Sequence, residues 1–445
     1  MRTLQDPLPI PARHFVPLAL LLFGLSSCGG GGGSPSVTAV ADSYYVNNSG
    51  APITIGAPGV LQNDSGSGLT AQLVSGPGTL TLNTNGSFTI TGGTPTSFTY
   101  RAVNGTGSAT ATATISINQP PVANNACTST PAGTPIGNGV LTATDPDNQT
   151  LTYQLVTGGT KGTVNVFPDG RYTYTPNTNL PSSDNKARGM DKFTFRVTDP
   201  FSLSSTAVVT VLIDGAVRIM PLGDSITAGI TDGNNPPTAT RVGYRLDLFN
   251  GLTTLSAGKY GIDFVGSQSE GAGAGLSDVN HEGHPGWCDD NTPTCNLGSG
   301  IDATITDFLN TNPADVILLH IGTNSFGTSS TGVNTILDNV NTWAGSNYPV
   351  NVFVARIIPT TDGSLDVQTF NNNVAPIATD RPNVKVFRVD QQSELDKPGD
   401  PNPNVADPNL MTVGNNLHPN AAGYTKMANR WQTDMINAGV LPNCP

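Results

Sequence analysis

Two patterns of hydrophobic and polar positions follow one another along the chain, and the change falls near residue 216. Before it, short segments alternate polar and apolar side chains between Gly, Asn and Pro, as in Ser87-Phe-Thr-Ile90 and Ser97-Phe-Thr-Tyr-Arg101. This alternation predicts half-buried β-strands. After it, continuous apolar runs are separated by segments with helical spacing, which predicts parallel strands covered by helices.

The alternating region contains two copies of one pattern, over residues 37–118 and 119–215. The turn Asn85-Gly86 and the strand at Ser97 in the first copy correspond to Asp169-Gly170 and the strand at Asp191 in the second. Such turns between alternating segments predict hairpins, and the repetition predicts tandem β-sandwiches. Both copies resemble bacterial cadherin-like or Ig-like repeats, which implies spacers or glycan-contacting modules.

The region 216–445 is predicted to be an α/β domain with a flavodoxin-like three-layer architecture. Its apolar runs predict strands at 217–222, 262–265, 316–321, 350–358 and 384–389. Apolar side chains spaced three and four residues apart predict helices at 301–309, 333–343, 367–377 and 421–438.

The first 28 residues have the pattern of an export signal. Arg2 and Arg13 precede an apolar stretch from Phe15 to Leu25 that is too short to span a bilayer. The segment Leu25-Ser-Ser-Cys28 resembles the lipobox of bacterial lipoproteins, which implies an acylated Cys28, a Gly-rich tether at 29–36 and a lipid anchor in the membrane. No Asp follows Cys28, so the resemblance implies the outer membrane or the cell exterior. An ordinary secretory peptide with an unrelated cysteine is the alternative.

The composition narrows the range of partners. The sequence carries 20 Lys and Arg against 32 Asp and Glu, a net charge of −12, and has no basic run. Nucleic-acid binding requires clustered positive charge, so the composition argues against that class of partner. No Gly-rich phosphate loop follows a predicted strand, and we expect no cofactor.

Four further cysteines are expected to lie in an oxidising compartment. The short segment between Cys288 and Cys295 predicts a disulfide there. With His281 and His284 the same pair could instead bind zinc, although structural zinc sites favour closer cysteine spacing. Cys127 and Cys444 could pair with each other or remain free.

Four motifs in the α/β region carry candidate chemistry. They are Gly223-Asp-Ser225 after the first predicted strand, Glu282-Gly-His-Pro-Gly286, Gly322-Thr-Asn324 after the 316–321 strand, and Leu417-His418-Pro before the last helix. Their order and their placement at strand ends and loops resemble the SGNH, or GDSL-like, hydrolases. The resemblance covers roughly the last half of the chain and implies a serine ester hydrolase.

Ser225 and His418 are the expected nucleophile and base. A serine hydroxyl attacks only when a base accepts its proton, and an imidazole suits that task near neutrality. The resemblance implies an oxyanion hole formed by the backbone N–H groups of Ser225 and Gly286 and the side-chain amide of Asn324. Gly283 is the alternative to Gly286.

The chain departs from the family at the acid of the triad. The family places Asp three residues before the histidine, where this chain has Asn415, and an acid after the asparagine of the third motif, where it has Ser325. An amide can orient an imidazole but cannot neutralise the imidazolium that forms. Three outcomes are open: a Ser–His dyad oriented by Asn415 or a backbone carbonyl, a substitute acid such as Asp407, or an impaired enzyme.

Other polar residues have two interpretations. Asp145, Asp147 and Asp199 could bind calcium, which requires six or more oxygen ligands, or they could form turns. His320 lies inside an apolar run and is expected to be a buried core or supporting residue rather than a catalyst.

The sequence around the second motif indicates a substrate class. Glu282-Gly-His-Pro-Gly-Trp287, Gly243-Tyr244-Arg245 and Ile262-Asp-Phe-Val-Gly-Ser267 resemble the acetylxylan-esterase branch of the family. This implies deacetylation of a plant polysaccharide with Trp287 and Tyr244 at the substrate, core packing being the alternative for Trp287. Two other functions fit the motifs: a lipase-like or polyester-cleaving hydrolase, and a glycan-binding or adhesion lipoprotein with a degenerate hydrolase domain.

Overall fold

The computed structural model describes residues 36–47, 52–91, 95–180, 186–231, 236–290, 295, 300–325, 328–414 and 416–444. The predicted export signal, Cys28 and nearly all of the tether lie outside the described residues. Within the described ranges, no helix is long and apolar enough to cross a membrane. These ranges form two compact units: one holds residues up to 123 with 143–152 and 196–206, and the other holds 124–142, 153–195 and 207 onward.

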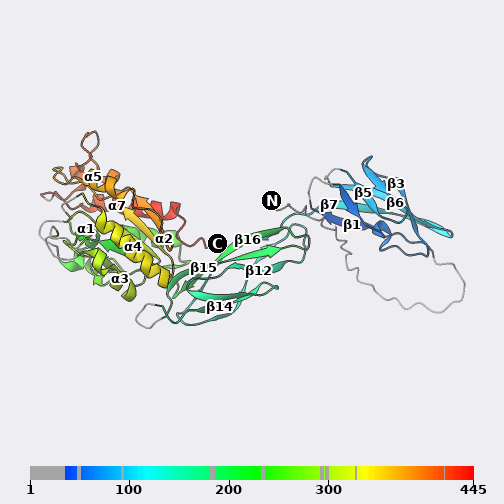
Figure 1. Cartoon of the computed structure of the whole chain (residues 1–445), viewed down its shortest axis with the longest axis horizontal. Coiled ribbons are helices and arrows are strands. Elements are labelled where there is room, and N and C mark those ends of the chain that lie inside the picture. Colours follow the sequence, from blue (N-terminus) through cyan, green and yellow to red (C-terminus); the bar gives the residue numbers. More distant parts are fainter. Residues whose placement is uncertain are drawn as a thin grey trace, which may run out of the picture. The chain divides into compact units, whose positions relative to one another are not determined.

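Residues 37–118, the first β-domain, form two sheets (Figure 1). The larger sheet has the order β1 (Asp42–Val46), β7 (Gly107–Ile117), β6 (Thr96–Asn104) and β3 (Thr70–Ser75), and the smaller β2 (Ile53–Ile55), β5 (Phe88–Ile90) and β4 (Leu80–Leu82). Phe88 meets Tyr44 and Phe98 edge-on in the core, with ring centroids 5.1 and 5.0 Å apart. The predicted turn at Gly86 joins β4 to β5, and its φ of 84° is one that glycine adopts readily.

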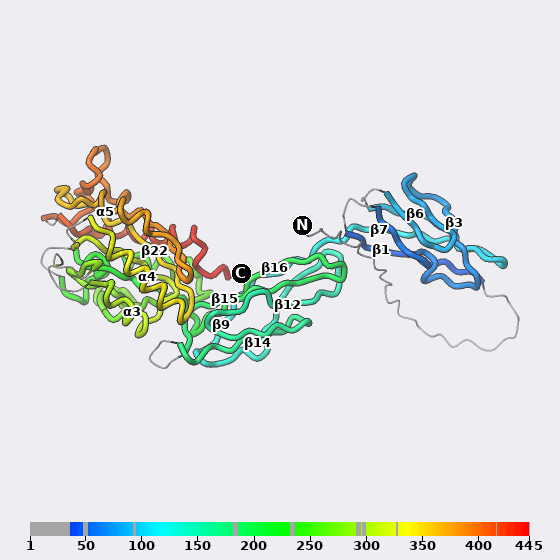
Figure 2. Tube along the Cα trace, in the orientation of Figure 1, coloured from blue at the N-terminus to red at the C-terminus, as the bar shows by residue number. Residues whose placement is uncertain are grey.

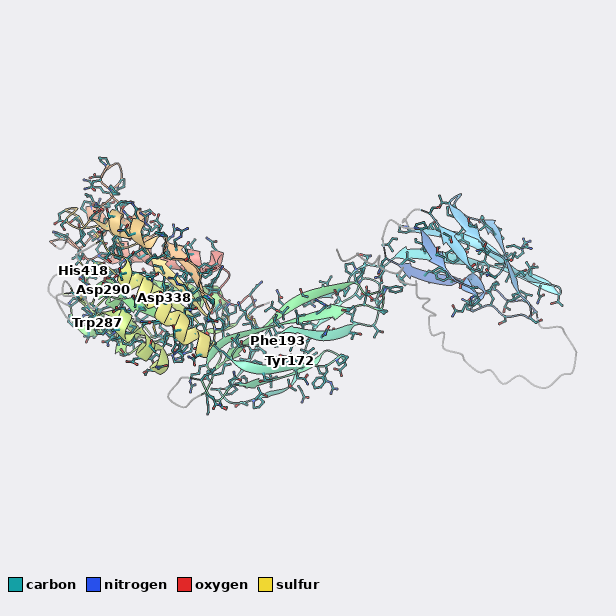
Figure 3. All side chains as sticks on the ribbon, viewed as in Figure 1. Tyr172, Phe193, Trp287, Asp290, Asp338 and His418 are labelled. Carbon is teal, nitrogen blue, oxygen red and sulfur yellow. A yellow bond between two sulfur atoms is a disulfide. The ribbon has the colours of Figure 1, made fainter. Side chains whose placement is uncertain are left out.

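Residues 119–215, the second β-domain, repeat this design. The largest sheet has the order β12 (Thr152–Thr157), β15 (Gly189–Thr198), β16 (Ser204–Ile213) and β9 (Ala126–Thr130); β10 (Ile136–Val140), β14 (Arg171–Pro176) and β13 (Gly162–Val166) form a second, and β11 (Ala143–Thr144) pairs with β8 (Val122–Ala123). Tyr172 and Phe193, labelled in Figure 3, pack with their ring centroids 5.2 Å apart. The alternating apolar positions of the sequence therefore supply this core.

The three aspartates considered for calcium accept hydrogen bonds from backbone N–H groups in turns and loops. Asp145 accepts hydrogen bonds from the backbone N–H groups of Asp147 and Gln149, and Asp199 accepts from those of Phe201 and Leu203. In the part of the chain that the structure describes, no group of three or more His, Cys, Asp or Glu side chains is arranged to hold a metal ion. The backbone hydrogen bonds of Asp145 and Asp199 are those of turn residues, and calcium binding by the three aspartates stays a prediction.

Residues 216–445, the α/β domain, are built on a largely parallel sheet. Its order is β19 (Gln268–Ser269), β20 (Asn280–Gly283), β17 (Ala216–Gly223), β21 (Val316–His320), β22 (Val350–Ala355) and β23 (Val384–Val389), with β18 (Gly261–Phe264) also paired to β17. Its helices are α1 (Ser225–Ala228), α2 (Arg245–Ser256), α3 (Ile301–Thr311), α4 (Thr331–Ser346), α5 (Val367–Val374), α6 (Gln391–Leu395) and α7 (Ala421–Asn437). Short 3₁₀ turns in this domain are η2 (Thr238–Thr240), η3 (Ala272–Ala274) and η4 (Pro408–Leu410), whereas η1 (Gly59–Leu61) lies in the first β-domain.

The predicted elements of this domain are present, and the sequence pattern missed several short ones. The predicted strand 384–389 has the bounds of β23, whereas the predicted strand 350–358 ends earlier, at Ala355. The pattern did not reveal α1, α2, α6, β19 or β20. Of these, β20 matters most, because its Glu282 and Gly283 pair with Leu222 and Gly223 of β17 and so bring the second motif beside the first.

Within the second compact unit, the second β-domain is attached to the α/β domain at several points. Cys127 on β9 forms a disulfide with Cys444, and Figure 2 shows the red C-terminal segment reaching these green strands. Lys161 forms an ion pair with Asp315 at the start of β21, and the two side chains are only 2% and 3% exposed. Tyr348 lies under the Lys161 ammonium, 3.9 Å from it. The sequence left two possibilities open for Cys127 and Cys444, and the structure shows that they pair with each other.

Candidate active site

Ser225 lies where the first strand of the α/β domain turns sharply into a helix. Strand β17 ends at Gly223, and the Asp224 carboxylate accepts a hydrogen bond from the Ile226 N–H to cap α1. A Cβ at Gly223 would lie 2.1 Å from the carbonyl oxygen of His320, so only glycine fits there. The strand and the cap together place the serine at the carboxyl edge of the sheet.

His418 reaches Ser225 from the loop that precedes the last helix. Its Nε2 lies 2.9 Å from Ser225 Oγ, a hydrogen bond between residues 193 positions apart. The loop is held by the Thr412 N–H, which donates to the His418 carbonyl at 3.0 Å, and by Asn420, which caps α7. Figure 3 places His418 and Trp287 at one end of the α/β domain. The structure therefore brings the expected nucleophile and base together.

The two candidates for orienting His418 have different outcomes. Asn415 lies outside the described residues. Asp407 accepts hydrogen bonds from the backbone N–H and the side-chain amide of Asn409, at 2.9 and 3.0 Å, and caps η4. Its carboxylate is used for that turn and makes no hydrogen bond to His418, so the structure does not support Asp407 as the substitute acid.

The expected oxyanion donors are the backbone N–H groups of Ser225 and of one nearby glycine, together with the Asn324 amide. Ser225 begins α1, so its N–H has no acceptor within the helix. Gly286 has a φ of 82°, and its N–H donates to no acceptor in the described part of the chain. The alternative donor, the Gly283 N–H, is taken by Nδ1 of His281 at 3.0 Å. Gly286 is therefore the better candidate of the two glycines.

Asn324 is held close to the second motif. Its side-chain nitrogen donates one hydrogen bond to the Trp287 carbonyl at 2.9 Å, which leaves its other N–H available. The Cys288 Sγ lies 3.4 Å from the Asn324 carbonyl oxygen, and Ser325 donates a hydrogen bond to Asp289. Ser325, at the family's acidic position, thus joins the third motif to the second instead of binding the histidine.

Trp287 stands in a small aromatic and charged cluster. The ring of His284 stacks on Trp287 with centroids 4.0 Å apart and on Phe308 at 5.3 Å. Nε2 of His284 lies 2.6 Å from the carboxylate of the buried Glu282, which also accepts from the Ser267 N–H at 2.7 Å. Trp287 is half-buried, so one part of its indole packs and another part reaches the surface.

Cys288 and Cys295 form the predicted disulfide. Both sulfur atoms are bonded to each other and cannot bind zinc as thiolates, while His281 and His284 are engaged by Gly283 and Glu282. The zinc interpretation is therefore wrong. The disulfide closes the loop that directly follows Trp287.

Tyr244, predicted to meet substrate, is instead a core residue. It is fully buried, its hydroxyl lies 3.2 Å from that of Thr227, and its ring packs against Trp431 at a centroid distance of 6.0 Å. The prediction was wrong because Tyr244 is buried and contacts Thr227 of α1, the helix that begins with Ser225, and so does not reach the surface where a substrate binds.

Arg245, the next residue, has a supporting role that the sequence analysis missed. This fully buried side chain donates to the carbonyls of Thr227 and Ala228 at the end of α1, both at 3.0 Å, and to that of Arg241 at 2.7 Å. It also donates to the carbonyls of Glu270 and Val279, which precedes β20. One guanidinium thus joins the serine helix to the segment that leads to the second motif. The only indication of this role in the sequence was the position of Arg245, a charged residue close to Gly243 in the Gly243-Tyr244-Arg245 motif.

Burial shifts the pKa of three groups behind the site. The Asp224 carboxylate is wholly buried, and loss of hydration raises its pKa to about 7. Burial likewise lowers the pKa of His281 and of His320 to about 4, so both are neutral imidazoles at pH 7. Neither nitrogen of His320 has a hydrogen-bond partner in the described ranges. His320 is a core histidine, as expected.

A cavity of about 260 Å³ opens next to the third motif. Gly322 and Thr323 line one side, and Ile357, Val367 and Phe370 from the loop after β22 and from α5 line the other. A Cβ at Gly322 would lie 2.3 Å from the Phe370 ring, so glycine keeps this wall close. The cavity is partly apolar and of the size that holds a small ligand group.

Comparisons with known proteins identify both β-domains. Residues 34–117 match the model of the bacterial Ig domain, and residues 118–215 match that of the bacterial cadherin-like domain. The predicted Ig-like and cadherin-like nature of the N-terminal region is confirmed.

The sequence is also similar to esterases. It is 29% identical over 237 residues to a multidomain esterase of Ruminococcus flavefaciens, a match that covers 49% of this chain and 28% of that protein. It is 30% identical to a solved family 3 carbohydrate esterase of Clostridium thermocellum, covering 50% of this chain and 96% of that one with a TM-score of 0.39. A family 3 carbohydrate esterase from Talaromyces cellulolyticus is 21% identical, with 50% and 97% coverage and a TM-score of 0.38. The chain thus combines Ig-like and cadherin-like domains with an α/β esterase-like domain.

Proposed function

From this homology to esterases, we propose that the α/β domain is an SGNH-type serine hydrolase with flavodoxin-like layering that removes short acyl groups, principally acetyl, from a polysaccharide. The observation that carries the proposal is the 2.9 Å contact between Ser225 Oγ and His418 Nε2. A hydroxyl and an imidazole in hydrogen-bond contact are the minimum needed for nucleophilic acyl transfer.

The reaction follows from the positions of these groups. His418 Nε2 accepts the hydroxyl proton while Ser225 Oγ attacks the ester carbonyl carbon. The negative charge that develops on the carbonyl oxygen is stabilised by the N–H groups of Ser225, Gly286 and Asn324, since preorganised donors cost no rearrangement at that moment. The bond to the sugar oxygen breaks as the imidazolium returns its proton to that oxygen. Water, activated by the same imidazole, then releases the acid from Ser225.

Two features support a small acyl group on a sugar. The cavity of about 260 Å³ beside Thr323 is large enough to hold a short acyl chain. The half-exposed indole of Trp287, held by His284, offers an apolar surface for a sugar ring. The solved carbohydrate esterases similar to this chain agree with such a substrate.

We further propose that the chain is exported and held by a lipid at Cys28, so that the Ig-like and cadherin-like domains separate the enzyme from the membrane. The two disulfides support an oxidising compartment, because such bonds persist outside the cytosol.

Nitrophenyl esters of increasing chain length and acetylated xylan, assayed with the wild type and with Ser225→Ala and His418→Ala, test the catalytic proposal. We expect turnover on acetate to exceed that on long-chain esters, and each variant to lose about 10⁴-fold or more in kcat. Preference for long chains would indicate a lipase-like or polyester-cleaving enzyme instead. Retention on insoluble glycan without hydrolysis would indicate a binding protein with an inactive domain.

A further inference from the structure

A second, larger cavity lies at the same edge of the sheet, away from Ser225. Its volume is about 360 Å³, and it is formed by the residues that end β22 and β23, by α5, and by Arg430 of α7. In parallel α/β sheets, ligands bind at the carboxyl ends of the strands, which is where this cavity opens. None of the four motifs contributes to it.

Three arginines line this cavity, although the chain as a whole is acidic. Arg356, Arg388 and Arg430 meet there, in a protein with only 20 basic residues and a net charge of −12. Asp390 is the only acidic side chain in the lining, and Glu394 and Asp434 pair with Arg430 next to it. Arg388 is therefore the arginine of this group without a carboxylate partner in the described part of the chain. Such a concentration of guanidinium groups favours an anionic ligand.

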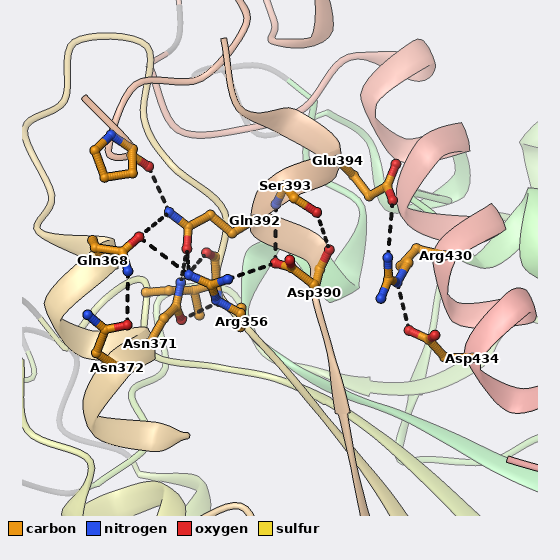
Figure 4. A network of polar contacts seen from close by, with 12 residues as sticks. Arg356, Gln368, Asn371, Asn372, Asp390, Gln392, Ser393, Glu394, Arg430 and Asp434 are labelled. Carbon is orange, nitrogen blue, oxygen red and sulfur yellow. Dashed lines mark hydrogen bonds and ion pairs between the residues drawn. The ribbon is translucent and has the colours of Figure 1, made fainter. Parts of the chain in front are cut away.

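Two of the arginines have N–H donors left for a ligand. Arg388 makes one long hydrogen bond, 3.5 Å, to the Ala375 carbonyl. Arg430 is paired through Nε with Asp434 at 2.7 Å and through one terminal nitrogen with Glu394 at 3.6 Å (Figure 4). A guanidinium has five N–H donors, so most of those on Arg388 and several on Arg430 have no acceptor in the described part of the protein.

The third arginine is fixed in place by neighbouring side chains. Arg356 donates to Asp390 at 3.2 Å, to Gln368 at 3.4 Å and to Gln392 (Figure 4). Gln392 is itself held by the Pro403 carbonyl at 2.7 Å. This network orients the guanidinium before any ligand arrives, which lowers the entropic cost of binding.

The lining also contains groups that suit hydroxyls. Asp390 accepts through one oxygen from Arg356 and Ser393, and its second oxygen makes no hydrogen bond within the described residues. Asn372 accepts from Gln368 at 2.9 Å, which leaves its amide N–H groups available. A carboxylate such as Asp390 would repel an inorganic anion. A sugar that carries both hydroxyls and a carboxylate can donate its hydroxyls to Asp390, accept from the Asn372 amide and bind the arginines through its carboxylate.

We propose that this cavity binds a uronic acid residue of a glycan, with the sugar carboxylate on Arg388 and Arg430 and its hydroxyls on Asp390 and Asn372. Ala375, a half-buried residue of the lining, offers an apolar contact to the C–H face of the ring. Helix α5 lines both this cavity and the smaller one beside Thr323, so one glycan chain can follow α5 from the ester to the uronate. The inference deepens the proposed function. It rests on that function in one respect only, which is that the bound glycan chain is also the substrate of the ester hydrolysis.

Binding is tested with the full chain carrying Ser225→Ala, so that no hydrolysis interferes. Ligand-observed NMR titrations compare the methyl glycosides of glucuronate and galacturonate with the neutral methyl glucoside and galactoside, and with sodium sulfate. We expect at least one uronoside to bind more tightly than its neutral counterpart and than sulfate. Arg388→Gln, at an exposed position, is expected to weaken that binding about tenfold, or about 1.4 kcal/mol.

The matched control is Arg171→Gln. Arg171 is an exposed arginine of the cadherin-like domain that pairs with Asp169, and its replacement should leave uronoside binding unchanged. The proposal is overturned if neither uronoside binds, if neutral sugars or sulfate bind as tightly, or if Arg388→Gln has no effect. Hydrolysis of nitrophenyl acetate by the wild-type chain reports the proposed function separately, so either idea can fail alone.

Discussion

At the scale of single residues, the serine depends on a charged side chain that touches no substrate. Arg245 donates to five backbone carbonyls from the interior, and two of them end the four-residue helix α1. So short a helix has little stability of its own. Its geometry, and with it the direction of the Ser225 hydroxyl, therefore depends on these hydrogen bonds, which makes Arg245 a positioning residue.

Arg245→Lys keeps the charge but removes the planar fork, and Arg245→Met removes both. We expect kcat to fall about tenfold in the first and about 100-fold in the second, because misplacement of a reacting group by about 1 Å costs about that much, while KM changes little. Steady-state kinetics with nitrophenyl acetate and the rate of Ser225 labelling by a fluorophosphonate measure this. A rise in KM at constant kcat would show that Arg245 acts on substrate binding instead.

Asp224 makes the stability of the α/β domain depend on pH. In the folded chain the pKa of Asp224 is about 7, above the ordinary 3.8. The protonated carboxyl therefore favours the folded state. Its contribution to the free energy of unfolding is complete below about pH 4 and is lost as the pH rises towards 7. Asp224→Asn keeps a capping side chain and removes the titration. We expect the variant to gain free energy of unfolding relative to the wild type by up to about 1.4 kcal/mol per pH unit across that window.

Denaturant titrations from pH 4.5 to 7.5 measure this difference. All three tryptophans, Trp287, Trp343 and Trp431, lie in the α/β domain, so their fluorescence follows that domain alone. If the free energy of unfolding of the two proteins changed with pH in the same way, Asp224 would have the same protonation in the folded and unfolded chains. That result would contradict the prediction.

At the scale of elements, the proposed oxyanion hole requires two loops to hold a fixed separation. The loop after β20 carries Gly286, the loop after β21 carries Asn324, and they are joined by the hydrogen bond from Asn324 to the Trp287 carbonyl. The disulfide between Cys288 and Cys295 closes the first loop next to that contact. The bond therefore acts on catalytic geometry more than on the unfolded chain, because it spans only 7 positions.

The double variant Cys288→Ser with Cys295→Ser is expected to lower kcat about tenfold through looser placement of the donors. Its effect on the midpoint of unfolding should be smaller than that of breaking the other disulfide. Kinetics with nitrophenyl acetate and tryptophan fluorescence test both statements. Full activity in the double variant would show that the loops are held without the bond.

At the scale of the whole molecule, the α/β domain forms one compact unit with the larger part of the cadherin-like domain, residues 124–142, 153–195 and 207–215. The disulfide between Cys127 and Cys444 spans 317 positions and ties the C-terminal end of the enzyme to β9. The buried ion pair of Lys161 with Asp315 adds a contact in which neither partner can be removed without leaving the other charge unpaired. These contacts make this part of the cadherin-like domain a structural support of the α/β domain.

Cys127→Ser with Cys444→Ser should lower the free energy of unfolding of the α/β domain by about 2 to 5 kcal/mol, since a long closed loop restricts the unfolded chain most. Turnover below the unfolding transition should remain near that of the wild type. This is the reverse of the pattern expected for the shorter disulfide. Equal effects of the two double variants on stability would contradict the assignment.

Local patterns were sufficient to predict much of this protein. Alternation with a period of two predicted the strands of both β-domains, the apolar run at 384–389 predicted β23 with its bounds, and the motif order predicted that Ser225 and His418 would meet. Spacing and turn residues act over a few positions, so they can be read without knowing the fold.

Other features depended on which segments the fold brings together. Nothing near Tyr244 in the sequence distinguishes a buried support from a substrate contact, and nothing near Cys127 identifies Cys444 as its partner. The short strand β20, the five acceptors of Arg245 and the three arginines of the larger cavity likewise come from distant segments. Local chemistry thus determined the elements and the candidate reacting groups, and tertiary packing decided burial, pairing and support, because those depend on neighbours beyond the local pattern, up to 317 positions away for Cys127 and Cys444.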